Sequence, residues 1–437
     1  MTHIFRRLQV RTMLLCWIVY AVIYFGRLNL SVALPELQNL LGVSKAEIGL
    51  FGTLFFWFYA IGQLFGGILG DKVSVRKLIF IGLFFSGFCN LLFSFSHNLF
   101  WMAVLWAFNG VFQSLIWSPL VKTIVRWVEP NRRNNSMIFV STSMVGGFIL
   151  AWGLLGIWVG KNTVSMLFLV PALTMLATAV IWFLFMRNRP KDFGIVVDWA
   201  EKEAKQELDR TYTEDKLDNT VIQYKTASSE VDTQPSIFKI AAASHLWLII
   251  IACFAQGIVR DGITLWAPTF FLETQAMEKG VLTASLLFLP FMNFIGILLA
   301  GWLSERLGNR VESSTAILFL SAMALLGCLF IFGRNNGTTA VILLGLSSGM
   351  MYGVNTLLVG VIPLQFEHYG RAASMAGLFN FLAYVASGFA SAFTGLLVDL
   401  SGWQGVLGTW ALLAGIGTLA LFFHEWIIHH KRQQTML

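Results

Sequence analysis

Charged residues are scarce in this sequence, and their scarcity is the first guide to its class. Asp, Glu, Lys and Arg make up 12% of the 437 residues, against roughly 25% in soluble domains. Hydrophobic residues make up 57%, which is more than a soluble core could bury. We therefore expect an integral protein of the inner or plasma membrane, with the lipid bilayer as its solvent.

Cysteine, histidine and catalytic motifs are equally sparse. The four cysteines lie inside apolar segments, which predicts buried thiols rather than a disulfide framework. No histidine lies deep inside a membrane-length segment, which excludes a histidine proton relay. The sequence contains no metal-ligand cluster, phosphate-cradling loop or nucleophile–base pair. The sequence therefore argues against an enzyme and against an ATP-driven pump. We expect no cofactor and no metal.

Long apolar windows are abundant, and their order predicts the fold. Each window is roughly 20 residues long, enough to cross a bilayer as a helix. The windows lie near residues 13–34, 48–69, 78–96, 100–125, 136–158 and 164–186, and then near 244–268, 281–303, 315–333, 338–362, 373–397 and 404–427. We therefore predict an all-α membrane protein with twelve transmembrane helices in two six-helix halves, 1–186 and 244–437. The residues between them, 187–243, mix charges of both signs and read as a solvated linker.

Basic residues predict the orientation of these helices. They cluster at the N-terminus and in alternate loops, at Arg6, Arg7, Arg11, Lys72, Arg76, Lys77, Arg126, Arg132 and Arg133. By the positive-inside rule, both termini and the linker are cytoplasmic. The formal net charge of +7 then reflects topology. Because the basic residues are divided among separate loops, we expect no nucleic-acid partner.

Two arginines lie well inside membrane-length windows, one in each half. Arg27 occurs in IVYAVIYFGRLNLSVALP and Arg260 in IIIACFAQGIVRDGITLWAP, and each precedes a proline by eight residues. A charge at that depth is costly, so it normally faces a counter-charge, a protein interior or a water-filled cavity. Arginine also presents a fixed fork of donors that suits phosphate, carboxylate or sulfonate. The pair predicts a central site for a small anion, although an acid or a helix dipole beside each arginine is the alternative.

A second repeat lies in register with the arginines. The loop pattern G-x-x-[GS]-[DE]-[KR] follows the second window and recurs 234 residues later, and the two arginines are 233 residues apart. Such spacing indicates parallel repeats related by an axis along the membrane normal. The acid and the basic residues can pair across the halves in one state and separate in another. The residues predicted to act as this gate are Asp71, Lys72, Arg76, Glu305, Arg306 and Arg310.

These motifs carry a resemblance to a known family. The repeated loop is similar to that of the major facilitator superfamily, and RDGITLWAPTF resembles the seventh-span signature of its organophosphate:phosphate antiporter family. The stretches YFGRLNLSVALPEL, FYAIGQLFGGILGD, NGVFQSLIWSPLVK and RNRPKDFG support it. That family includes glycerol-3-phosphate and hexose-phosphate transporters. The resemblance implies transport by alternating access, with Arg27 and Arg260 clamping the anionic group of the substrate.

Further site residues are predicted partly from spacing and partly from the resemblance. Tyr20 and Tyr24 share a helical face with Arg27, and Tyr59 lies one turn from Gln63. Hydroxyl groups on apolar rings suit a polar site inside lipid. The resemblance adds positions in other windows. The full predicted substrate-binding set is Arg27, Arg260, Tyr20, Tyr24, Tyr59, Gln63, Gln113, Trp117, Ser143, Tyr352 and Tyr384.

The sequence departs from the family where cationic groups are expected. Gln63 and Leu28 stand where phosphate-exchanging members carry lysine, and Ser143 stands where they carry histidine. Each charge in a low-dielectric pocket is worth several kcal/mol to a dianion. The remaining set of two arginines and one acid therefore favours a monoanion over a phosphate dianion.

Asp261 leaves the mechanism open. It could pair with an arginine, or it could take a proton and couple transport to the proton gradient. As the neighbour of Arg260 it points about 100° around the helix, so it need not face the same cavity.

We expect a secondary active transporter of a small organic anion, similar to a sugar phosphate, a sulfonate or a carboxylate, that acts as a monomer. Protons or a counter-anion are the possible coupling partners. The alternatives are a proton-coupled symporter of a sugar acid and a membrane sensor built on the same fold.

Overall fold

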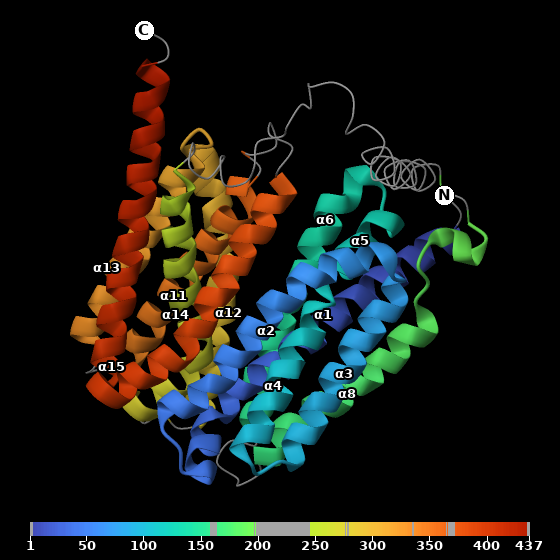
Figure 1. Ribbon diagram of the computed structural model, residues 1–437, viewed down its shortest axis with the longest axis horizontal. Helices are drawn as coiled ribbons and strands as arrows, with labels where there is room; N and C mark the ends of the chain where they lie inside the picture. The colour runs from blue at the N-terminus through green and yellow to red at the C-terminus, as the bar shows by residue number, and fades with distance from the viewer. Residues whose placement is uncertain are drawn as a thin grey trace, which may run out of the picture.

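The computed structural model describes residues 3–157, 164–195, 197, 245–275, 277, 279–333, 336–363, 365 and 372–434. All regular elements within these ranges are helical. Figure 1 shows two bundles side by side, one formed by the first half of the sequence and one by the second. Most of the predicted linker, and the side chains of 64–72, lie outside the described residues.

The first half follows the predicted windows closely. Its long helices are α1 (His3–Leu41), α2 (Lys45–Lys72), α3 (Val75–Phe95), α4 (Leu99–Ser114) and α8 (Val164–Phe185). The remaining elements are α5 (Trp117–Trp127), α6 (Pro130–Ser141), α7 (Ser143–Phe148), the π-helix η1 (Ile149–Leu154), the 3-10 helix η2 (Leu155–Ile157) and, after α8, the 3-10 helix η3 (Pro190–Phe193). The window at 100–125 is thus divided between α4 and α5. Pro119 explains the division, because it has no N–H to donate to the carbonyl four residues earlier.

The second half repeats this plan. It contains α11 (Leu246–Gln275), α12 (Lys279–Arg306), α13 (Val311–Phe332), α14 (Gly337–Asn355), the π-helix η4 (Thr356–Val361) and α15 (Ala372–Gln434). The long α15 covers two predicted windows and is interrupted at Gly402, where φ is 67° and ψ is −174°. A positive φ suits glycine, which has no Cβ. In the described part of the chain, nine helices are long and apolar enough to cross a membrane.

Matching caps begin the fourth window of each half. The side chain of Asn98 accepts hydrogen bonds from the backbone N–H groups of Phe100 and Trp101 at the start of α4. At the start of α14, Asn336 accepts from Thr338 and Thr339 in the same way. An asparagine at this position satisfies donors that the first helical turn leaves unpaired. The repeat therefore extends to the local chemistry of the helix starts.

The two halves contact each other closely along α2 and α15. The Thr53 hydroxyl donates to the Gly388 carbonyl at 2.6 Å, and the Ser391 hydroxyl donates to the Gly49 carbonyl at 2.7 Å. A Cβ atom added at Gly395 would lie 2.2 Å from the carbonyl oxygen of Lys45. Small residues permit such close backbone approach between membrane helices. We call this contact the α2–α15 seam, formed by Lys45, Gly49, Thr53, Trp57, Val385, Gly388, Ser391 and Gly395.

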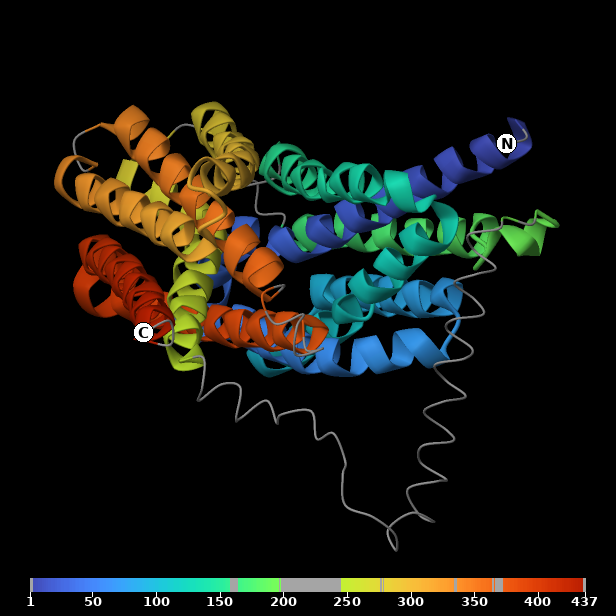
Figure 2. The same ribbon diagram turned by 90° about the horizontal axis from the view of Figure 1, so that it is seen from above.

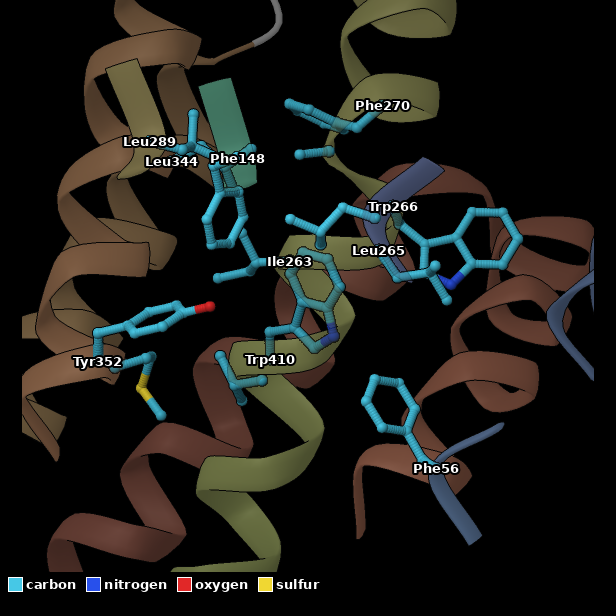
Figure 3. Close-up of a cluster of buried hydrophobic side chains, with 14 of the residues drawn as sticks. Phe56, Phe148, Ile263, Leu265, Trp266, Phe270, Leu289, Leu344, Tyr352 and Trp410 are labelled. Atoms are coloured by element: carbon cyan, nitrogen blue, oxygen red, sulfur yellow. The ribbon is translucent and has the colours of Figure 1, made fainter. Parts of the chain in front are cut away.

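The seam lies at one end of the molecule. In Figure 1 the two bundles meet at the end where α1 passes into α2, whereas both ends of the chain lie toward the opposite side. Figure 2 shows the two bundles adjoining when seen from above. An apolar cluster crosses the boundary as well, since Phe56 and Phe148 of the first half belong to the same buried cluster as Leu265 and Tyr352 of the second (Figure 3). These contacts position the cavity described next.

Candidate functional site

A cavity of about 1030 Å³ lies between the two halves. Helices α1, α2, α5 and α7 contribute to its wall from the first half, and α11, α14 and α15 contribute from the second. Its volume is at the upper end of the range for small-molecule sites, which are mostly apolar with a few convergent polar groups. The predicted residues in the wall are Tyr20, Tyr24, Arg27, Tyr59, Gln63, Trp117, Arg260, Asp261, Tyr352 and Tyr384.

Arg27 lies within a cage of aromatic rings. Its guanidinium carbon is 5.0–5.7 Å from the centroids of five rings, those of Tyr24, Phe55, Phe56, Tyr59 and Tyr384. Ring faces attract a cation but do not neutralise it. Within the described part of the chain, its guanidinium makes no ion pair and no hydrogen bond. Arg27 therefore offers an uncompensated positive charge and free N–H donors to the cavity.

Arg260, unlike Arg27, is paired with an acidic side chain. Its Nε donates to Oδ1 of Asp261 at 3.0 Å, and its Nη2 donates to Oδ2 at 2.6 Å. Its Nη1 donates to Oδ1 of Asn355 on α14, while the Ser387 hydroxyl on α15 donates to Oδ2 of Asp261. The side chains of Arg260 and Asp261 are only 10% and 8% exposed. A bidentate pair of this kind balances the charge of Arg260 within its own helix.

The position of Asp261, which the sequence leaves open, is defined by the structure. Adjacent residues on a helix diverge by about 100°, and on that ground Asp261 need not have faced the same cavity as Arg260. In the structure both residues line the cavity wall. The long arginine side chain folds back toward its neighbour, so the divergence of the Cβ atoms does not separate the charged groups.

Tyrosines and amides join the two halves inside the cavity. The rings of Tyr59 and Tyr384 are 4.7 Å apart across the boundary. Gln63 donates to the Tyr59 hydroxyl at 3.3 Å and accepts a hydrogen bond from the Asn380 amide. Tyr20 packs on Tyr24 and on Trp117, at 5.3 and 4.7 Å between centroids. The cavity thus presents several hydroxyl and amide groups near the Arg27 cage.

Two predicted site residues lie elsewhere. Gln113 is 1% exposed and donates to the Gly26 carbonyl at 3.3 Å, behind Arg27 rather than in the cavity. Ser143 is 0% exposed, and its hydroxyl donates to the Val140 carbonyl of the preceding turn. Neither is among the residues of the cavity wall. The Gln113 amide nitrogen and the Ser143 hydroxyl donate to helix backbone, so these donors are not presented to the cavity in which a substrate would bind.

Five polar residues of the second half were not predicted. Asn355 and Asn380 line the cavity, as do Thr264 and Thr356, and Ser387 holds Asp261. Their spacing from predicted site tyrosines could have indicated that the two asparagines belong to the site. Asn355 follows Tyr352 by three residues and Asn380 precedes Tyr384 by four, so each pair shares a helical face.

The predicted gate residues do not pair across the halves in the described part of this structure. Arg76 donates to the Phe183 carbonyl at 2.7 Å and lies over the Phe183 ring, within its own half. Arg306 lies over the ring of Trp302, while Glu305 and Arg310 are exposed. The side chains of Asp71 and Lys72 lie outside the described residues. The gate therefore stays a prediction.

Comparison with known proteins identifies the family to which this fold and sequence correspond. The sequence model of the Major Facilitator Superfamily matches residues 16–390. The chain is 25% identical to a probable hexose phosphate transport protein of Chlamydia pneumoniae, over 98% of this chain and 93% of that protein. It is 23% identical to the membrane sensor protein UhpC of Salmonella typhimurium, over 93% of this chain and 89% of that one.

A solved structure of the nucleoside transporter NupG superposes with a TM-score of 0.72 at 14% identity, over 96% of this chain and 99% of that one, which supports the fold alone. The relatives confirm the resemblance to the organophosphate:phosphate antiporter family, and their names describe transport and sensing rather than catalysis. The match over residues 16–390 and the all-helical membrane fold lead to one conclusion: this chain is an integral membrane protein that belongs to the Major Facilitator Superfamily.

Proposed function

We propose that this protein is a secondary transporter that moves a small organic anion across the membrane by alternating access. The observation that carries the proposal is the uncompensated guanidinium of Arg27 in a large cavity between two repeated halves. A cation at that depth is costly unless an anion joins it during the working cycle. Sugar phosphates, sulfonates and carboxylates all supply such an anion, and the relative from Chlamydia pneumoniae is named for hexose phosphate.

Alternating access is supported by the difference between the two ends of the cavity, of which one is closed and the other extends away from the seam. The α2–α15 seam closes the end remote from the termini. Wall residues such as Trp117, Ser141 and Gly377 extend the cavity toward the other end. With the termini in the cytoplasm, as the positive-inside rule indicates, this conformation receives substrate from the cytoplasmic side. Opening of the seam and closure of the opposite end would then complete the cycle.

Flux through purified protein in proteoliposomes tests the proposal. We expect uptake or exchange of at least one labelled sugar phosphate, sulfonate or sugar acid. Arg27→Ala and Arg260→Ala should each lower that flux at least tenfold, because the first removes the free cation and the second leaves Asp261 unpaired. Arg132→Ala is the matched control, since Arg132 is an exposed arginine away from the cavity wall. Flux like that of the wild type in both cavity variants would refute the two-arginine site.

A sensor is the second candidate, because one relative is named a membrane sensor protein. The same proteoliposomes separate the two functions. Saturable anion binding without measurable flux would favour the sensor, whereas flux through the protein excludes a purely sensory role.

The geometry supports proton symport less well than it supports anion transport without a proton carrier. Asp261 is the acid in the described cavity wall, as a proton carrier would be. Its carboxylate accepts hydrogen bonds from Arg260 and Ser387, so both of its oxygens are already engaged by donors. A fixed negative charge is the better description of this residue.

A further inference from the structure

We propose that Asp261 sets the charge of the substrate, so that the cavity accepts an organic anion with one negative charge and disfavours a dianion. The inference rests on the proposed transport function and narrows its substrate class. Asp261 acts here as a built-in anion that occupies the second arginine.

The charge balance of the cavity is the first step. Arg27, Arg260 and Asp261 are the charged residues in its described wall. Two positive charges and one negative charge leave the empty cavity with a net charge of +1. A monoanion brings that sum to zero, whereas a dianion leaves one negative charge uncompensated in a region of low dielectric constant.

The second step is that Arg260 is already occupied. Three of its nitrogens donate to Asp261 and Asn355. The pair is held by residues of two other helices, Asn355 on α14 and Ser387 on α15. An incoming anion would have to displace a carboxylate on the adjacent residue, which has no translational freedom to lose. Arg260 is therefore a poor second clamp for a substrate.

The third step is that Arg27 is open. The rings that surround it provide π faces, and no oxygen in the described residues accepts a hydrogen bond from its guanidinium. Its fork of N–H groups fits one carboxylate, sulfonate or sulfate group. The rings of Phe55 and Phe56 offer apolar contact to the organic part of the same molecule. The geometry thus fits an organic monoanion bound at Arg27.

Matched ligand pairs test the inference on the purified, full-length protein. Glucose 6-sulfate and glucose 6-phosphate share a sugar and differ in charge at pH 8, because the second pKa of a phosphate ester is about 6. Gluconate and glucarate are sugar acids with one and two carboxylates. Dissociation constants from calorimetry, with thermal unfolding as a check on folding, give the preference within each pair. We expect the wild type to bind the singly charged member of at least one pair tenfold or more tightly.

Variants at Asp261 isolate the cause. Asp261→Asn raises the net charge of the cavity to +2, so the preference should shift at least tenfold toward the dianion. Asp261→Glu retains the charge and should retain the wild-type preference. The double variant Arg260→Gln/Asp261→Asn returns the net charge to +1 without leaving either position 260 or position 261 as a charge that has lost its partner, and it should restore the preference for the monoanion.

The outcomes separate this inference from the proposed function. Tighter binding of glucose 6-phosphate and glucarate by the wild type, or an unchanged preference in folded Asp261→Asn, would overturn the inference and leave anion transport standing. If the wild type neither binds nor transports any of these four anions or other sugar phosphates, sulfonates and sugar acids, the proposed function fails, and the inference fails with it.

Discussion

At the scale of single residues, three side-chain amides converge on one backbone oxygen beside Arg27. Asn90, Asn109 and Gln113 donate to the Gly26 carbonyl at 3.3, 3.2 and 3.3 Å. Asn29 donates to Asn90 at 2.9 Å. All four amides are at most 1% exposed. Because hydrogen bonds among buried amides rigidify their surroundings, this network holds α1 in place where Arg27 projects into the cavity.

Asn90→Leu tests the contribution of this network. The substitution keeps the branched shape of the side chain but removes a donor to Gly26 and the acceptor of Asn29, leaving buried polar groups underpaired. We expect a loss of about 1–3 kcal/mol of stability, read as a lower midpoint of thermal unfolding in detergent. Ser321→Ala is the control, since its hydroxyl bonds only to a carbonyl of its own helix. An equal midpoint in the two variants would contradict a stabilising role for the network.

The sequence revealed the charged residues of the site better than the orientation of its polar ones. Arg27 and Arg260 stand out because a charge inside an apolar window needs an explanation. Gln113 lies on a helix that is apolar on most faces, so periodicity could not show that its amide points toward α1 rather than into the cavity. The pairing of Arg260 with Asp261 depends on side-chain rotamers, which spacing along a helix does not determine.

At the scale of helices, the glycines of the seam control how closely the halves approach. A Cβ added at Gly49 would lie 2.6 Å from the Ser391 carbonyl oxygen, and one at Gly395 would lie 2.2 Å from that of Lys45. Both contacts involve backbone, which cannot rotate aside as a side chain can. The seam therefore closes only because these positions lack side chains.

Gly395→Ala should open the seam. The added methyl group collides with the α2 backbone only when the halves are closed at this end, so it disfavours the conformation described here. We expect a greater labelling rate of a cysteine placed at Thr53, measured with a membrane-impermeant maleimide after Cys328, which is exposed, is replaced by serine. Gly408→Ala is the control, because the nearest atom to its added Cβ is 3.7 Å away. Labelling at the rate of this control would show that the seam tolerates the methyl group.

The helix order was predictable from hydropathy, whereas the interruptions were not. Each apolar window falls on one helix or on consecutive helical elements, because length and composition report lipid exposure directly. The π-helical turns of η1 and η4 depend on packing against other helices, which no local pattern encodes. The count of twelve membrane helices stays a prediction, since nine helices in the described residues are long and apolar enough to cross a membrane.

At the scale of the whole molecule, polar contacts tie the two halves at the end remote from the termini. Lys45 of α2 pairs with Glu273 of α11 at 3.2 Å, and the Ala46 N–H donates to Asp399 at 3.1 Å. The Trp403 indole also donates to Glu273 at 2.9 Å. The Lys45–Glu273 and Ala46–Asp399 contacts join the halves beside the seam and must break if the halves separate there. The Trp403 bond lies within the second half and holds Glu273 in place.

Cross-linking at this position should trap the protein. A Lys45→Cys/Glu273→Cys variant without Cys328, treated with a short bifunctional maleimide, would be held closed at the seam. We expect flux to fall at least tenfold, while binding of the transported anion to detergent-solubilised protein stays within threefold of the untreated sample. The two single-cysteine variants, treated alike, should keep their flux. Undiminished flux in the cross-linked protein would argue against alternating access.

The unpaired guanidinium of Arg27 has an electrical consequence. Moving one elementary charge through the full membrane potential changes its energy by about 2.3 kcal/mol per 100 mV. On the proposed mechanism the empty site carries +1 and the loaded site carries zero. The field therefore acts on the return of the empty protein and not on the step that carries substrate. In a cell that is negative inside, the resting site is drawn toward the cytoplasm, the side to which the proposed orientation opens this conformation.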